Sequence, residues 1–156
     1  MPAGAEEHDI KINSQFLHKL EFLDEMYSYI KEQLYHNQSH IIVGDMNSAP
    51  HINDVWSHKQ LINVVSHTDI ERQKLTNIIQ DNHLIDVMRH NIPDDDKVYS
   101  WWSYRNRDWK KSNRGRRLDH IWITNNLEAH YKDHSIYKKS RDFDRPSDHV
   151  PILIEI

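Results

Sequence analysis

The sequence has 156 residues, with 20 lysines and arginines against 24 aspartates and glutamates, a formal net charge of −4. That length is typical of one domain, and the negative charge excludes a protein that coats nucleic acid with its whole surface. The sequence has no cysteine, which excludes a disulfide scaffold and a zinc site built on thiolates. No apolar run approaches the roughly 20 residues of a membrane span. No secretion signal opens the chain, so a cytoplasmic protein without membrane partners is expected.

The first predicted element is an amphipathic helix. Apolar residues recur from Phe16 to Leu34 at spacings of three and four, which places them on one helix face. Asn13 or Ser14 can cap the start of this helix, because a short polar side chain accepts hydrogen bonds from free backbone amides. Residues 40–45 are a short apolar run that ends in glycine and aspartate, which predicts a buried strand. A helix followed by a buried strand favours an α/β fold.

A capping-box pattern predicts a second helix. Thr68 and Glu71 are spaced so that each side chain can bond the backbone amide of the other, and the helix should run to about Asp81. Residues 83–90 are expected to form either a further helical turn or a strand, and residues 93–96 a polar loop. The other strand-like segments are aromatic or apolar at alternate positions: residues 99–104, 118–124, 131–137 and 150–156.

Polar side chains stand at the ends of three of these strands. Asp45 and Asn47 follow the first strand, Asp119 opens a later one, and Asp148 and His149 precede the last. In packed sheets the strand ends converge on one rim, so these groups can meet although they are far apart in the sequence. Each motif alone is more often structural, as a turn, a strand cap or a buried hydrogen-bonded aspartate.

The chemistry available to such a set is metal-assisted acid–base chemistry. Carboxylate and amide oxygens are hard ligands of the kind that Mg²⁺ or Mn²⁺ prefers. In a His–Asp pair the carboxylate fixes the imidazole tautomer and stabilises its charged form. Together these groups could polarise a phosphate, activate water and stabilise developing charge, which phosphodiester hydrolysis requires.

Histidine pairs offer an alternative metal site, which the sequence disfavours. His36 and His40, like His130 and His134, are four residues apart, a spacing that on a helix places two imidazoles on one face. Each pair spans a predicted boundary or strand, and neither has the glutamate of a zinc motif. No zinc site is therefore expected.

A basic segment stands out against the acidic chain. Residues 101–117 contain seven basic residues and one acid, a local charge of +6. Aromatic residues are interleaved with them, of which Trp102 is expected to pack in the core. The contrast predicts a surface that follows nucleic-acid phosphates, and the alternative is a solvated charged face. The seven basic residues are Arg105, Arg107, Lys110, Lys111, Arg114, Arg116 and Arg117.

Three stretches, "IIVGDMNSAP", "YSWWSYRNRDWKKSNRGRRLDHIWIT" and "RPSDHVPILIEI", together resemble the exonuclease III family of apurinic/apyrimidinic endonucleases. This family is part of the exonuclease–endonuclease–phosphatase superfamily. A fourth stretch, "DVWSHKQLINVVSHT", resembles its alphaproteobacterial-type exodeoxyribonuclease III members. The resemblance implies a four-layer α/β sandwich, of which residues 1–156 would be the C-terminal half, with one mixed or antiparallel sheet and flanking helices. It also implies Mg²⁺- or Mn²⁺-dependent cleavage of double-stranded DNA at abasic sites and removal of nucleotides from 3′ ends.

The resemblance assigns roles to the residues at the strand ends. Asp45 would activate the attacking water, and Asn47 would stabilise the transition state near the metal. Asp148 would belong to the metal network. His149, held by Asp119, would contact the scissile phosphate. The metal ligands would accordingly be Asp45, Asn47, Asp148 and His149.

The basic segment receives a role from the same resemblance. Trp101 and Leu118 match residues that line the pocket for the abasic sugar. Arg116 stands where some members of the family carry tryptophan, so this pocket is expected to be more basic. The residues expected to contact DNA are therefore Trp101, Arg105, Arg107, Arg114, Arg116 and Leu118.

The family's chain is longer than this one, so the first half of the sandwich and its metal-binding glutamate are expected to be absent. The chain should then dimerise or bind a separately made N-terminal half. Two other interpretations remain open: a non-catalytic remnant that binds DNA or a partner, and a sister phosphoesterase acting on another phosphodiester. The sheet face expected to lack its partner carries residues such as Ile42, Ile121, Ile123, Ile152 or Ile154.

Overall fold

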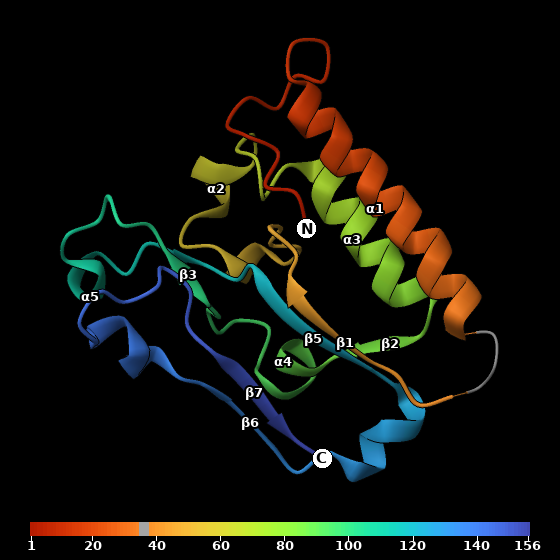
Figure 1. Ribbon diagram of the computed structural model, residues 1–156. Helices are drawn as coiled ribbons and strands as arrows, with labels where there is room; N and C mark the ends of the chain where they lie inside the picture. The colour runs from red at the N-terminus through yellow and green to blue at the C-terminus, as the bar shows by residue number, and fades with distance from the viewer. Residues whose placement is uncertain (35–37) are drawn as a thin grey trace.

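The computed structural model describes residues 1–34 and 38–156 (Figure 1). This part of the chain contains both helices and strands, and every pairing between the strands is antiparallel. The strands form one three-stranded sheet and two two-stranded sheets, with helices beside them. The α/β class with antiparallel pairing and flanking helices is therefore confirmed. None of the described helices is both long enough and apolar enough to cross a membrane.

Two long helices begin where their capping residues predict. Helix α1 (Ser14–Gln33) follows Asn13, whose side chain accepts hydrogen bonds from the first backbone amides. Helix α3 (Asp69–Asp81) follows Thr68, which forms the reciprocal capping box with Glu71. The two helices lie side by side in Figure 1. Both predicted helices are therefore confirmed, including the cap of each.

The three-stranded sheet has the order β1 (Ile41–Asp45), β5 (Asp119–Thr124), β2 (Leu84–Asp86). Strand β5 lies between the other two and is mostly buried. Its register with β1 places Asp45 directly opposite Asp119. The end of one strand and the start of another, 74 residues apart in the sequence, thus meet at the same edge of the sheet.

Residues 83–90, for which either a strand or a helical turn was expected, contain both. Strand β2 passes directly into helix α4 (Val87–Asn91), whose N-cap is Asp86. Four further short helical segments lie elsewhere in the chain: η2 (Ile52–Asp54), α2 (His58–Leu61), η3 (Asn125–His130) and η4 (Lys138–Asp142).

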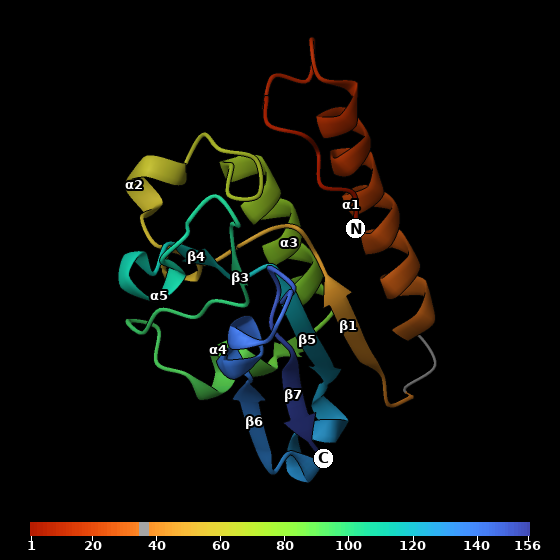
Figure 2. The same ribbon diagram turned by 60° about the vertical axis from the view of Figure 1, so that its left-hand side comes forward.

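Each face of the central sheet has its own cover. On one face, Trp122 packs in a core cluster with α1 and α3. On the other, residues of β5 pack against the two-stranded sheet of β6 (Asp133–Ile136) and β7 (Ile152–Glu155). Figure 1 and Figure 2 both show the two helices and the β6–β7 pair on opposite sides of β5.

This arrangement corrects the expected composition of the open sheet face. Ile121 and Ile123 are only 5% and 1% exposed, because β6 and β7 cover β5. The exposed residues of that face lie on β1 instead. Val43 is 64% exposed and Ile41 46% exposed, and they pair in register with Ile121 and Ile123, so their side chains point to the same face. The sheet face expected to lack a partner is therefore open only at Ile41 and Val43, and not at Ile121 and Ile123.

Ile42, Ile152 and Ile154 also depart from the expectation of an open face. All three are half-buried. Ile42 packs with the cluster formed by α1 and α3, and the other two pack with the residues of β5. The strip without a cover is therefore confined to the edge strand β1 on this side of the sheet.

The basic and aromatic segment folds as two short strands around a short helix. Strands β3 (Trp101–Trp102) and β4 (Gly115–Arg116) pair with each other, and α5 (Trp109–Ser112) lies between them in the sequence. The predicted strand over residues 99–104 is only two residues long, because the chain turns at residues 103–106. Gly115 allows a close approach of Tyr99, whose ring lies 2.5 Å from where a Cβ would stand.

Candidate metal and phosphodiester site

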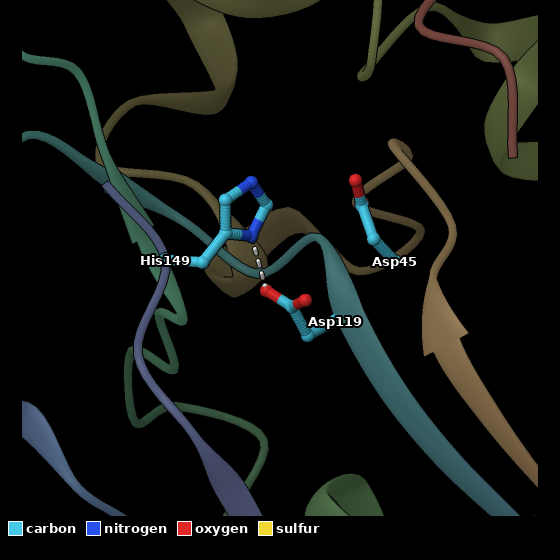
Figure 3. A group of neighbouring side chains, drawn as sticks. All are labelled: Asp45, Asp119 and His149. Carbon is cyan, nitrogen blue, oxygen red and sulfur yellow. Dashed lines mark hydrogen bonds and ion pairs between the residues drawn. The ribbon is translucent and has the colours of Figure 1, made fainter. Parts of the chain in front are cut away.

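Asp45, Asp119 and His149 converge from three segments of the chain. Asp45 ends β1, Asp119 begins β5, and His149 lies three residues before β7. One ligand atom from each of the three side chains lies within 4.8 Å of the other two. Figure 3 shows the three side chains facing a common space between the strand ends. The structure thus brings together three of the residues that the sequence placed at strand ends.

A hydrogen bond joins two members of this group, as the sequence predicts. The Nδ1 atom of His149 donates to Oδ2 of Asp119 at 2.8 Å. This bond raises the pKa of His149 above its ordinary value, although partial burial of the ring opposes the rise. The nearby carboxylates of Asp45 and Asp148 act in the same direction. The imidazole is therefore more readily cationic than a free histidine, which suits contact with a phosphate.

Ser100 holds the two segments that carry this pair. Its buried hydroxyl accepts hydrogen bonds from the backbone amides of Leu118 at 3.1 Å and Asp119 at 3.0 Å. Its carbonyl oxygen accepts from the amide of Val150 at 2.8 Å. Ser100 therefore fixes the start of β5 relative to the chain beside His149. Nothing in the sequence around Ser100 indicates this role, because its partners are distant in the sequence.

Asn47 forms a tight turn with Asp45. Its backbone amide donates to Oδ1 of Asp45, and its side-chain Nδ2 donates to Oδ2, both at 2.8 Å. Asn47 has a positive φ of 43°, in the left-handed region that asparagine tolerates better than most residues. Nδ2 also donates to the backbone carbonyl of Met1 at 2.9 Å. With both of these hydrogens engaged, the side-chain oxygen is the atom of Asn47 that could meet an ion or a phosphate.

Asp148 lies beside the group but is not one of the three residues in it. Its Oδ2 atom accepts a hydrogen bond from Nε1 of Trp101 at 2.9 Å. Trp101 also forms a backbone bridge with His149. The direct contact of Asp148 is therefore with the aromatic residue of the basic segment. Its expected place in a metal network stays a prediction.

The donor set fits a divalent cation. Asp45 and Asp119 are opposite each other on adjacent strands, where two like charges repel unless a cation lies close by. Their carboxylate oxygens are the kind of ligand that Mg²⁺ or Mn²⁺ prefers, and the imidazole of His149 lies beside them. Within residues 1–34 and 38–156, this is the one group of three such side chains with the spacing of a metal site. His36, one of the four histidines considered for zinc, lies outside the described residues.

A cavity of about 630 Å³ lies beside Trp101. Arginine side chains cover aromatic rings in its wall: Arg114 lies over Trp56 at 4.7 Å and Arg116 over Trp101 at 5.4 Å from the ring centres. Arg105 also lines the cavity, as do apolar residues of the chain around α2. The cavity therefore combines apolar surface with positive charge. Trp56 was not expected here, and its sequence context gives no signal for it.

The arginines expected to contact DNA differ in their surroundings. Arg105 and Arg107 are exposed, and Arg105 lies 3.6 Å from the carboxylate of Glu6. Arg116 is half-buried and donates hydrogen bonds to the carbonyl of Val65 at 3.2 Å and the hydroxyl of Ser66 at 2.6 Å. Arg116 is thus held in a fixed position, whereas the other two face solvent.

Arg117 of the basic segment and the neighbouring Leu118 are buried, which the local sequence does not reveal. Arg117 is 1% exposed and makes paired hydrogen bonds with the carboxylates of Asp54 and Asp86. It therefore stabilises the interior and is not part of a DNA-facing surface. Leu118 is 5% exposed and packs in a cluster with Trp101, but does not itself line the cavity. Trp102 is fully buried, which confirms its expected place in the core.

Comparisons with known proteins match most of this chain. A profile described as "Endonuclease/Exonuclease/phosphatase family" matches residues 10–149. The chain is 32% identical over 139 residues to an exodeoxyribonuclease of Bacillus subtilis, covering 89% of this chain and 52% of that protein. It is 28% identical over 149 residues to exodeoxyribonuclease III of Haemophilus influenzae, covering 91% of this chain and 55% of that protein.

The fold also matches that of a solved structure. An AP endonuclease from Archaeoglobus fulgidus superposes with a TM-score of 0.88 and 27% identity. The match covers 99% of this chain and 59% of the archaeal one. The chain thus spans little more than half the length of the proteins to which it is similar.

Proposed function

The chain belongs to the endonuclease/exonuclease/phosphatase family, and from this premise we propose that it carries the metal-dependent phosphodiesterase site of an exodeoxyribonuclease III-type DNA-repair enzyme. Its substrate would be double-stranded DNA with abasic sites or 3′ ends. The observation that carries the proposal is the convergence of Asp45, Asp119 and His149, with the hydrogen bond from His149 to Asp119. The names of the two bacterial relatives support the same reaction class.

The residues divide the work of hydrolysis between them. Asp45 would accept a proton from the attacking water, and its two hydrogen bonds from Asn47 keep its carboxylate in place for this task. Asn47 would stabilise the charge that develops on the phosphate oxygens. His149 would contact the scissile phosphate as a cation, since Asp119 stabilises its charged form.

Mg²⁺ or Mn²⁺ is the cofactor that we propose for this site. The residues that would hold it are Asp45, Asn47 and Asp148, directly or through water, with Asp119 as a neighbour; His149, as an imidazolium, would contact the phosphate and not the ion. A bound divalent cation would polarise the phosphate toward attack. The repulsion between the opposed carboxylates of Asp45 and Asp119 supports this assignment, because a cation removes it.

The basic segment would bind the DNA backbone. Arg105 and Arg107 are exposed and could pair with phosphates. Trp101, Arg114 and Arg116 line the cavity, and we propose that this cavity receives the damaged or terminal nucleotide. Leu118 would support it indirectly, through its packing against Trp101. The hydrogen bond from Trp101 to Asp148 supports a direct connection between this cavity and the phosphodiester site.

We further propose that residues 1–156 are the C-terminal portion of the family's domain. The match to little more than half of each relative supports the view that the chain is a portion of the domain, and the resemblance of its sequence motifs to the family supports the C-terminal position. The exposed side chains of Ile41 and Val43 support it as well, because they leave apolar surface at the edge of the sheet without a cover. A separately made N-terminal half would cover this strip, and a second copy of the chain is the alternative partner.

A cleavage assay tests the proposal. A duplex with one abasic site is incubated with Mg²⁺ and the chain, with and without a separately made N-terminal half, and a matched intact duplex and a generic phosphodiester serve as controls. We expect cleavage at the abasic site that depends on Mg²⁺ and increases when the N-terminal half is added. DNA binding without cleavage in either condition would favour a non-catalytic remnant. Cleavage of the generic phosphodiester alone would favour a sister phosphoesterase.

A further inference from the structure

Lys19 is a charged residue in the interior of the protein, where lysine is rare. It lies on α1, and its side chain is 0% exposed, as is that of its ion-pair partner Glu71 on α3. The ammonium group also donates hydrogen bonds to the backbone carbonyls of Asn47 at 2.7 Å and Ala3 at 3.4 Å. An ammonium has three N–H donors, and each has an oxygen acceptor here.

The contact with Asn47 connects Lys19 to the phosphodiester site. The backbone amide of Asn47 is bonded to the carboxylate of Asp45, and its carbonyl is bonded to Lys19. The left-handed backbone conformation of Asn47 persists only where its surroundings hold it. The two bonds hold Asn47 from both sides. A shift of this residue would move both hydrogen bonds that orient Asp45.

Glu71 extends the same network toward the cavity. Its carboxylate accepts hydrogen bonds from the amide of Ser66 at 3.0 and 2.9 Å and from the hydroxyl of Thr68 at 2.6 Å. The hydroxyl of Ser66 in turn accepts from Arg116, whose guanidinium lies over Trp101. A continuous chain of contacts therefore leads from the turn at Asn47 to the arginine in the wall of the cavity.

We propose that Lys19 and Glu71 are a positioning pair for the phosphodiester site. Lys19 fixes the turn that presents Asp45 and Asn47, and Glu71 fixes the loop that orders Arg116. The pair acts through these residues and does not touch the substrate. Its consequence for catalysis rests on the proposed function, whereas its effect on the turn does not depend on any activity.

A purely structural role makes a different prediction. Replacing both members of a buried ion pair by neutral groups is often tolerated, because the cost of desolvating the two charges disappears with them. If stability were the only role of Lys19 and Glu71, a neutral pair that keeps the fold would also keep the turn at Asn47 and the activity. If the pair positions the turn, the fold survives but the turn loosens.

The test uses the double variant Lys19→Met/Glu71→Gln. Methionine fills the space of the lysine stem without its donors, and glutamine keeps one acceptor oxygen for the capping box around Thr68. Leu75→Ala is the matched control, because Leu75 is 0% exposed in the same core cluster but has no part in the network. Glu71→Gln alone should change the same quantities less, and it replaces the double variant should that protein not fold.

Two quantities are measured well below the unfolding temperature. Hydrogen exchange followed by NMR reports the amide of Asn47, and single-turnover cleavage of abasic duplex, with the N-terminal half added, reports the chemical step. In the double variant we expect exchange at Asn47 to accelerate at least about tenfold while the amides of β1 and β5 are unchanged. We expect the cleavage rate to fall at least about tenfold. Leu75→Ala should leave both quantities within about twofold of the wild-type values.

The outcomes distinguish a failure of the positioning role of Lys19 and Glu71 from a failure of the proposed phosphodiesterase function. Wild-type exchange at Asn47 and a wild-type cleavage rate in the double variant would overturn the positioning role. Equal acceleration at Asn47 in Leu75→Ala would also overturn it, since the effect would then follow from lost stability. Accelerated exchange in the double variant only, combined with a wild-type protein that cleaves no phosphodiester, would leave the positioning role intact and contradict the proposed function.

Discussion

The contact between Asp119 and His149 is the most informative one at the scale of single residues. Asp119 begins a buried strand, and His149 lies in the segment before β7, so the bond joins parts of the chain 30 residues apart. Each residue alone has an ordinary structural explanation. The bond between them, with a carboxylate oxygen of Asp45 within 4.8 Å, favours acid–base chemistry instead.

Asp119→Asn should remove the charge that stabilises the imidazolium of His149. The pKa of His149 would then fall toward its ordinary value, and the fraction of cationic imidazole would decrease. We expect turnover on abasic duplex to fall by about 100-fold or more, with the fold preserved, because the amide fits the same space. Steady-state cleavage measures this, with Asp95→Asn in the exposed loop as control. A variant as active as the wild type would show that the pair has no catalytic role.

His67 gives a pH-dependent contribution to stability. It is 0% exposed, its Nδ1 donates to the carbonyl of Ala49 at 2.7 Å, and its Nε2 lies 2.9 Å from Nδ1 of His58. Burial lowers the pKa of His67 to about 4. The unfolded chain therefore binds a proton first as pH falls. This contribution is complete above about pH 6.5 and is lost as pH falls toward about 4.

Urea titrations at several pH values test this behaviour. Between about pH 6.5 and about pH 4, the free energy of unfolding should fall by up to about 1.4 kcal/mol per pH unit from this group alone. His67→Asn retains a donor for the carbonyl of Ala49 but cannot titrate. Its free energy of unfolding should therefore fall less steeply with falling pH, by up to about 1.4 kcal/mol per pH unit. An identical slope in the two proteins would assign the acid sensitivity to other groups.

At the scale of elements, the segment from β3 to Arg117 contains arginines in two different environments. Arg105 and Arg107 face solvent, whereas Arg117 forms a buried ion network with Asp54 and Asp86. The two acids hold the pKa of Arg117 above its already high value, and Arg117 holds the pKa of Asp86 well below its usual range. Arginines of one segment therefore differ in environment: Arg105 and Arg107 are available to solvent, where we propose that they bind DNA, and Arg117 stabilises the interior.

Single substitutions of Arg105 or Arg107 to alanine should weaken binding to all duplex sequences. Each lost phosphate contact should reduce the slope of log affinity against log salt by about one unit. Arg117→Ala should instead lower stability strongly, because it removes the buried cation shared by Asp54 and Asp86 and leaves Asp54 with Arg89 as its remaining charged partner. Filter binding over a range of salt concentrations measures the slopes. Unchanged slopes for both exposed arginines would identify the segment as a solvated face.

The sequence predicts local elements well and distant partners poorly. Helices α1 and α3 follow from apolar spacing and caps, both of which are local. The group of Asp45, Asp119 and His149 could be expected because all three lie at predicted strand ends. Ser100, Trp56 and the pair of Lys19 and Glu71 could not, since their roles arise from contacts between residues distant in sequence. The burial of Ile121 depends in the same way on the position of β6 and β7.

At the scale of the whole molecule, the open strip on β1 should control association. Val43 and Ile41 are exposed on an edge strand, where both apolar surface and free backbone groups favour contact with another chain. We expect the isolated chain to self-associate at micromolar concentration, and Val43→Lys to reduce this association. Ile12→Lys is the control, because Ile12 is 74% exposed but lies outside the sheet. Light scattering measures the mass, and equal association of all three proteins would place the contact elsewhere.

Asp45→Asn provides the most direct test of the central claim that the strand ends form a metal-dependent phosphodiesterase site. The measurement compares cleavage and affinity for the same abasic duplex, with the N-terminal half added, in Mg²⁺ and after its removal. We predict that turnover by Asp45→Asn falls by about 100-fold or more while DNA affinity stays within about threefold, because the change alters the chemistry and not the phosphate-binding surface. Removal of Mg²⁺ should abolish wild-type cleavage. Equal losses of turnover and affinity, or cleavage that persists without a divalent cation, would contradict the account.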